Sequence, residues 1–222
     1  MTIGRLGRGV STSAWAKTDT HPEVLDGFNK WYGDVTSFHA DFHQTTLNQM
    51  WGAEEKAGGE VWFKKPGLMH WKYEFPQEDI IVINPEGFFW YVPEDKQVIK
   101  KEPGEAFRII SPMSILGDNM QLEKDFEIKG IEAIRNHDSK KTLGYAISLV
   151  PRNPEMAVKR ISVEVRAEQF SLAAIEVEES SGNRNRIEFK EIEMNRETDP
   201  ELFLFSPPPG TKVITPKDFP AW

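Results

Sequence analysis

The sequence contains no cysteine among its 222 residues. Without thiols the chain can form no disulfide, no thiolate metal site and no iron–sulfur centre, and it has no cysteine nucleophile. It also has no run of about 18 apolar residues, the length that a membrane-spanning helix needs. The formal net charge of -8 argues against a general nucleic-acid binder, which needs an excess of positive charge to neutralise a row of phosphates.

Catalytic signatures are missing as well. The chain has no G-x-S-x-G elbow, no P-loop and no H-E-x-x-H motif. Adjacent carboxylates such as Glu54-Glu55 and Glu178-Glu179 fall in predicted turns and strand ends, where solvated surface is the simplest interpretation. We therefore predict that the protein is not an enzyme, with no catalytic residues and no cofactor.

One group of side chains has the spacing of a metal site. His39, Asp41 and His43 alternate along a predicted strand, so the three could share one face. The competing interpretation is a solvated strand face, with Phe38 and Phe42 pointing to the other side. The other three of the five histidines are scattered and supply no clear fourth ligand, so we predict no metal.

Hydrophobic residues make up 39% and charged residues 28% of the chain, which is typical of one folded domain. The first twenty residues contain no apolar stretch of about 7–15 residues, so no intact secretory signal is visible. We expect residues 1–18 to be a disordered leader or an appended segment. Residues 19–222 are expected to form a single domain.

Hydrophobic spacing predicts a helix over residues 21–33, followed from Val35 by short strands separated by turns. An apolar, helical stretch is predicted at 105–118, within this antiparallel meander. Counting gives about ten or eleven strands, all in antiparallel order, and a sheet of that length must curl or close. The fold class is therefore α+β, with helices that can cover one open face.

Aromatic residues are abundant, with seven tryptophans and fourteen phenylalanines. The runs EVWF and FFWY place large apolar side chains on consecutive residues, which point to opposite faces of a strand. One face can be the protein interior, whereas the other needs a helix, a partner or a ligand over it. The pattern leaves a packed core and a lined cavity equally open.

Four blocks of sequence match one known family in consistent order. They are VTSFHADFHQ at 35–44, GEVWFKKPGLMHWKYEFP at 59–76, IIVINPEGFFWYVPEDKQV at 80–98 and LFLFSPPPGTKVI at 202–214. Together they make residues 22–215 resemble the periplasmic outer-membrane lipoprotein carrier family LolA. The related receptor LolB is itself a lipoprotein and would need an N-terminal cysteine.

The resemblance implies an incomplete (unclosed) antiparallel β-barrel covered by a lid of short helices, with a hydrophobic cavity between them. It further implies a periplasmic carrier, its signal peptide removed, that takes up the acyl chains of outer-membrane lipoproteins. The implied partners are those lipoproteins, an inner-membrane ABC-type lipoprotein-releasing complex and an outer-membrane lipoprotein receptor. We expect a monomer without stable membrane insertion.

Strand alternation within the implied fold gives the predicted lining of an acyl-chain cavity. The side chains expected on the sheet are Phe38, Phe42, Phe63, Met69, Trp71, Tyr73 and Trp90. Those expected on the lid are Val24, Phe28, Ile109, Ile110, Met113 and Leu116. A strand offset by one residue would turn its whole set to the other face.

One position departs from the family pattern. The family commonly has an arginine before the proline of the second block, where it ties the lid to the barrel, and here that position is Lys65. Lysine keeps the charge but loses the planar fork of five donors. We expect Lys65 to be the lid latch. Two other functions remain open on the same fold: a carrier of another lipid or glycolipid, and a sensor that binds lipoproteins or proteins without transport.

Overall fold

The computed structural model describes residues 21–102, 122–153 and 156–215. The leader expected at 1–18 lies outside these ranges. So does the whole of the helical stretch predicted at 105–118, including its four expected lining residues Ile109, Ile110, Met113 and Leu116.

Strands account for most of the described chain. In chain order the elements are α1 (Pro22–Asp34), β1 (Ser37–Asn48), β2 (Ala53–Lys64), β3 (Leu68–Phe75), β4 (Ile80–Asn84), β5 (Gly87–Val92), β6 (Gln97–Lys101), α4 (Leu122–Asp125), β7 (Phe126–Arg135), β8 (Thr142–Pro151), β9 (Val158–Arg166), β10 (Leu172–Glu179), β11 (Arg184–Met194), the 3-10 helix η1 (Pro200–Phe203) and β12 (Lys212–Ile214).

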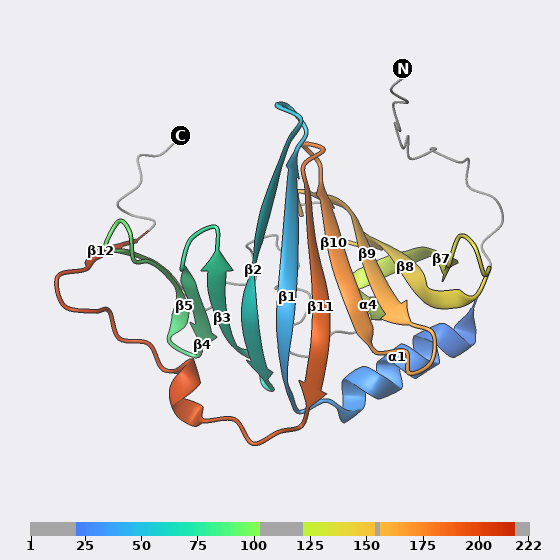
Figure 1. Ribbon diagram of the computed structural model, residues 1–222, viewed down its shortest axis with the longest axis horizontal. Helices are drawn as coiled ribbons and strands as arrows, with labels where there is room; N and C mark the ends of the chain where they lie inside the picture. Colours follow the sequence, from blue (N-terminus) through green and yellow to red (C-terminus); the bar gives the residue numbers. More distant parts are fainter. Residues whose placement is uncertain (1–20, 103–121, 154–155, 216–222) are drawn as a thin grey trace, which may run out of the picture.

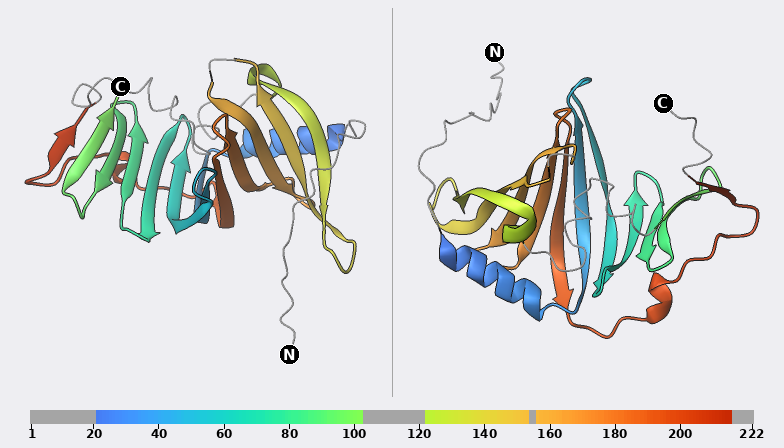
Figure 2. Two further views of the ribbon diagram at one scale, coloured as in Figure 1. Left: turned by 90° about the horizontal axis from the view of Figure 1, so that it is seen from above. Right: turned by 180° about the vertical axis from the view of Figure 1, so that it is seen from behind.

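All twelve strands belong to one sheet, in the order β12-β6-β5-β4-β3-β2-β1-β11-β10-β9-β8-β7. The sheet curls without closing, because β12 and β7 remain at opposite edges (Figures 1 and 2). The predicted unclosed antiparallel barrel is thus confirmed. The sheet has twelve strands, whereas ten or eleven were expected. The expected antiparallel order holds except at one edge, where β12 pairs in parallel with β6.

Helix α1 forms where the sequence predicted it. A proline lies in its first turn, where a backbone N–H would have no partner within the helix, so the N–H that proline lacks is not missed. Its buried side chains are Val24, Phe28, Trp31 and Tyr32, which belong to the same core cluster as one face of the sheet. The helix therefore lies across one end of the strands β8–β11 and covers part of the sheet's curled interior (Figures 1 and 2).

The opposite, convex face is ionic over β9, β10 and β11. Glu178 is buried there and accepts hydrogen bonds from Lys159 Nζ at 2.7 Å and Arg160 Nη2 at 2.9 Å. Burial works to raise the pKa of Glu178, but the Lys159 hydrogen bond and the Arg160 charge outweigh it and hold that pKa below its usual value. Arg186 similarly makes two hydrogen bonds to Glu164, at 2.7 and 2.8 Å.

Over β4 and β5 the convex face is apolar, with Val82 and Phe89 paired there, and the chain itself covers it. We call residues 196–211 the strap, because this segment runs from β11 past the lower ends of β3, β4 and β5 to β12 at the edge of the sheet (Figure 1). The strap buries Phe203, whose carbonyl accepts from Asn84 Nδ2 at 2.8 Å, and stacks Phe205 on Phe89 at 5.1 Å. The strap thus covers the convex side of β5, the second of the two faces to which the consecutive aromatic residues of FFWY point.

Two glycines make a matched test of the register between β2 and β3. A Cβ on Gly59 would lie 1.9 Å from the Lys72 carbonyl oxygen, at a register shift between β2 and β3. We expect Gly59→Ala to lower the free energy of unfolding by about 3 kcal/mol, at the upper end of overpacking costs. Gly33, in α1, has nothing within 4 Å of such a Cβ. Gly33→Ala is expected to raise that free energy by about 0.5 kcal/mol, since alanine favours helix. Urea unfolding measures both; a neutral Gly59→Ala would contradict the register.

Candidate functional site

Three rows of cross-strand neighbours define the sheet's concave face. Directly paired residues of adjacent strands point to the same side, so each row shares one face. The rows are Phe38–Phe63–Met69–Ile83–Phe88, Ala40–Val61–Trp71–Ile81–Trp90 and Phe42–Gly59–Tyr73. All seven sheet residues of the predicted cavity lining therefore lie on one face.

Aromatic rings meet edge to face at the centre of this concave face. Phe42 lies 4.9 Å from Trp71 and 5.0 Å from Tyr73, with interplanar angles of 73° and 81°. Gly59 sits between Phe42 and Tyr73 in the third row, and its lack of a side chain lets the two rings touch. This geometry is the one that the ring quadrupole favours.

Burial decreases along the second row, from β3 at the centre of the sheet toward the edge formed by β6 and β12. Trp71 is fully buried, Ile81 is 5% exposed and Trp90 is 37% exposed. Trp90 is thus a large apolar side chain on the concave face that meets solvent. At the other end, Val24 and Phe28 of α1 are buried in the same cluster, so helix and sheet share one apolar interior.

Two polar groups at the margin of this face have partners. The Tyr73 hydroxyl donates to Gln44 Oε1 at 2.8 Å, and Trp90 Nε1 donates to Asp79 Oδ2 at 2.8 Å. Burial, with the nearby Asp79 charge, raises the pKa of Tyr73 further above its ordinary value, so the phenol stays neutral. This margin therefore offers no phenolate nucleophile or base.

Two other polar groups, in the apolar interior, have no hydrogen-bond partner within the described part of the chain. The indole Nε1 atoms of Trp31 and Trp71 are buried, and neither has a hydrogen-bond acceptor among residues 21–102, 122–153 and 156–215. Buried donors are usually paired, because an unpaired one costs free energy. Both N–H groups could donate to a polar atom that entered the apolar interior.

Helix α1 ends against the turn between β2 and β3, at the residue predicted to latch the lid. Lys65 Nζ donates to the Tyr32 carbonyl at 2.5 Å and lies 4.2 Å from the centre of the Tyr32 ring. Asn195, which the sequence analysis missed, adds a second tie: its Nδ2 donates to Asp34 O at 2.9 Å and its Oδ1 accepts from Thr36 N at 2.8 Å. In the sequence it is only the last residue of a predicted strand, IEFKEIEMN at 187–195.

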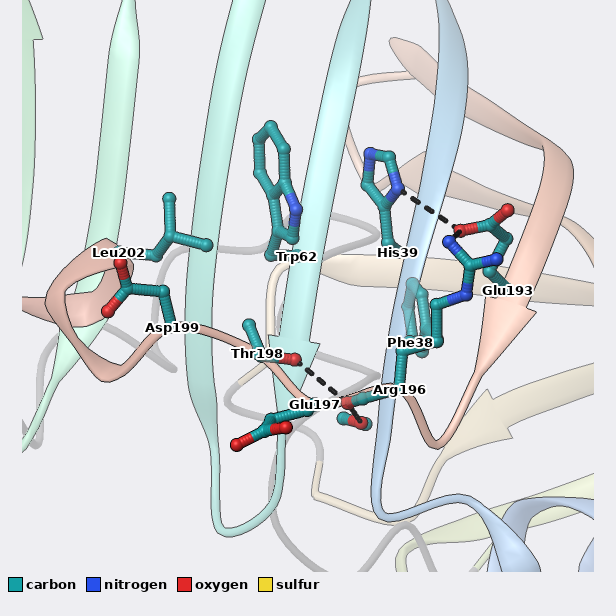
Figure 3. A pocket seen from close by; sticks show the side chains of 10 residues that line it. Phe38, His39, Trp62, Glu193, Arg196, Glu197, Thr198, Asp199 and Leu202 are labelled. Atoms are coloured by element: carbon teal, nitrogen blue, oxygen red, sulfur yellow. Dashed lines mark hydrogen bonds and ion pairs between the residues drawn. The ribbon is translucent and has the colours of Figure 1, made fainter.

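A hollow lies on the convex face, between the strap and the strands β1 and β2 (Figure 3). Its volume is about 180 Å³, below the roughly 300–1,000 Å³ typical of small-molecule sites. Glu193 and Arg196 form an ion pair at 2.6 Å in its wall. A small, charged hollow of this kind does not suit a long apolar ligand.

The possible metal group lies on the same convex side. His39 stacks on Trp62 at 4.7 Å, and its Nε2 lies 3.2 Å from Glu60 Oε1. Asp41 and His43 are exposed to solvent. Within residues 21–102, 122–153 and 156–215, no three histidine, aspartate or glutamate side chains are grouped so that they could hold a metal ion.

Fold and site together define a class of protein: an incomplete antiparallel barrel whose concave, aromatic face is partly covered by an N-terminal helix. The model of the family described as outer membrane lipoprotein carrier protein LolA matches residues 33–206. The chain belongs to this LolA family.

Two named relatives agree with that assignment, and one solved structure shares the fold. Proteins named outer-membrane lipoprotein carrier protein are 29% identical in Nitrosospira multiformis, covering 88% of this chain and 90% of the relative, and 27% identical in Chromohalobacter salexigens, covering 81% of each. A conserved protein from Thermus thermophilus, 14% identical, superposes with a TM-score of 0.51 over 87% of this chain and 98% of its own, a likeness of fold alone. Among the described residues, no helix is long and apolar enough to cross a membrane.

Proposed function

We propose that this protein is a periplasmic carrier that holds the acyl chains of outer-membrane lipoproteins against its concave face. In this proposal it takes cargo from an inner-membrane ABC-type releasing complex and passes it to an outer-membrane receptor. The observation that carries the proposal is the aromatic concave face itself, which is continuous with the buried face of α1 and opens at Trp90. The names of the LolA relatives support it.

The chemistry of this face suits acyl chains. Each methylene removed from water contributes about 0.8 kcal/mol, so a carrier must cover a long chain with apolar surface. The face combines aromatic rings with a flexible thioether, for example Phe63 beside Met69. Such side chains can adapt to a flexible hydrocarbon chain, which a rigid polar pocket cannot do. The unpaired N–H groups of Trp31 and Trp71 would then be available to ester or amide carbonyls of the cargo. No step in this role makes or breaks a bond.

A fluorescent fatty-acid probe tests whether the concave face is the site. Trp90→Gln removes a ring from this face at a partly exposed position, and glutamine can still donate to Asp79. We expect it to weaken probe binding about tenfold, since one large apolar contact is worth roughly that factor. Phe75→Gln is the matched control, because Phe75 is 42% exposed and lies against His43 on the convex side. Equal probe affinity in both variants and the wild type would contradict the site.

A transfer assay tests the cargo. Membrane vesicles that carry the releasing complex and a triacylated lipoprotein are incubated with ATP and this protein, and the soluble fraction is recovered. We expect a one-to-one soluble complex that forms only when the lipoprotein is acylated. Cargo that stays in the membrane, while an established carrier releases it, would contradict the lipoprotein role and favour another lipid or a sensor.

A further inference from the structure

The turn between β1 and β2 exposes two large apolar side chains. Met50 is 80% exposed and Trp51 is 76% exposed, the two highest values among the exposed large hydrophobic residues of the described chain. We call residues 48–53 the hairpin tip. Two large apolar side chains exposed side by side are typical of an interaction site.

The hairpin tip projects beyond its neighbours on one side. Strand β3 ends at Phe75, which pairs with Gly58, so the first five residues of β2, Ala53–Ala57, have no partner on that side. Five strand residues span roughly 17 Å. Figure 1 shows the β1–β2 hairpin rising above the ends of β3, β4 and β5, at the opposite end of the strands from α1. A flat surface approaching from that end would meet the tip first.

Hydrogen bonds hold the hairpin tip in shape. Asn48 Oδ1 accepts from the backbone N–H groups of Met50 at 3.0 Å and Trp51 at 3.2 Å. The backbone N–H of Gln49 donates to Asn183 Oδ1 at 3.1 Å, which fastens the tip to the neighbouring β10–β11 turn. The two apolar side chains are therefore presented by an ordered turn, and little conformational entropy is lost when they bind.

The end of the hairpin carries no charge. Residues 48–53 read NQMWGA and residues 180–183 of the adjacent turn read SSGN, none of them ionisable. The first charged side chains of β2 beyond the tip are Glu54, Glu55 and Lys56, of which Glu54 and Lys56 pair with each other at 3.4 Å. Burying residues 48–53 themselves against an uncharged surface therefore desolvates no ion.

We propose that the hairpin tip inserts shallowly into the interfacial region of a lipid bilayer, with zwitterionic lipid headgroups as its natural surface. Tryptophan favours that region because its ring is apolar and its N–H can still reach water or a headgroup. Two side chains give a weak and reversible contact, unlike an anchor with two acyl chains. The tip thus makes brief membrane contact without fixing the protein there.

Flotation with phosphatidylcholine vesicles tests the proposal on the protein without cargo. We expect the wild type to float weakly and equally at low and high salt. Met50→Ser/Trp51→Ser should lower the partition coefficient at least about tenfold. The matched control is Leu143→Ser/Leu204→Ser, at two other exposed positions, 51% and 68%; it should float like the wild type. All variants alter exposed side chains, and an unchanged melting temperature checks their fold.

Three results would overturn the membrane contact. Equal flotation of the tip variant and the wild type would mean that lipid binds elsewhere. Flotation only with anionic lipid, lost at high salt, would mean an electrostatic contact. No flotation of the wild type in excess lipid would leave a protein partner as the tip's ligand. The test is independent of the carrier proposal, because Trp90→Gln should weaken probe binding and leave flotation unchanged, and the tip variant should do the converse.

Discussion

Replacing Phe42 by alanine is expected to lower the free energy of unfolding by about 3–5 kcal/mol, the range for a large aromatic side chain removed from a core. Phe42 is 1% exposed and contacts the rings of both Trp71 and Tyr73. It also pairs across the β1–β11 junction with Phe189, which is buried too. Its loss opens a cavity where two halves of the sheet meet. Urea denaturation followed by tryptophan fluorescence and far-UV circular dichroism measures the change.

Phe75→Ala is the control for this substitution. Phe75 is a phenylalanine of the same sheet, 42% exposed, so its truncation should cost under about 1 kcal/mol. If both variants lost the same free energy, the centre of the concave face would not be packed as the structure has it. If Phe42→Ala left the stability unchanged, the rings around Phe42 would have to close over the vacated space.

Strand alternation predicted much of the candidate site, because it has a fixed period of two residues. The positions of Phe38 and Phe42 differ by an even number, and so do those of Met69, Trp71 and Tyr73. Each set therefore falls on one face once a strand is assumed. The short turns between strands then bring the sets together, since neighbouring strands of a meander pair directly.

The sequence did not predict what covers the convex face. Consecutive aromatics in FFWY indicated that both faces of β5 need cover, but any helix, partner or ligand could have met that need. The cover is the strap, where Phe205 stacks on Phe89 from more than a hundred residues away along the chain. Parallel pairing of β12 with β6 was equally hidden, because three residues carry no pattern that distinguishes a parallel strand from a tail.

The role of Asn195 could not be predicted from the sequence for a similar reason. Its amide joins Asp34 and Thr36, on the segment that leads from α1 to β1, to the end of β11. Its φ of 57° lies in the left-handed region, which asparagine tolerates better than most residues. Nothing local to the residue shows that the N-terminal segment will return there, so only the folded chain reveals the contact.

Replacing Lys65 by leucine is the substitution with the largest expected effect on ligand exchange. It removes the ammonium that donates to the Tyr32 carbonyl at 2.5 Å and lies over the Tyr32 ring. A hydrogen bond from a charged group contributes about 1.5–3 kcal/mol, so we expect a comparable loss in the free energy of unfolding. We propose that α1 then opens more readily from the concave face, and that a bound fatty-acid probe dissociates about tenfold faster. Stopped-flow probe displacement measures that rate.

Two matched variants separate the latch from other effects of the change. Lys64→Leu alters the neighbouring lysine, which pairs with Ser37 at the end of β2. It should change neither stability nor probe release by more than about twofold. Lys65→Arg keeps the charge and supplies the planar fork common in the family, so its release should be as slow as in the wild type or slower. Fast release from Lys65→Leu with slow release from Lys65→Arg would identify the cation–carbonyl tie as what holds α1 closed. Unchanged release from Lys65→Leu would assign that role to Asn195 at the other side of the helix end, where Asn195→Ala should then produce the faster dissociation.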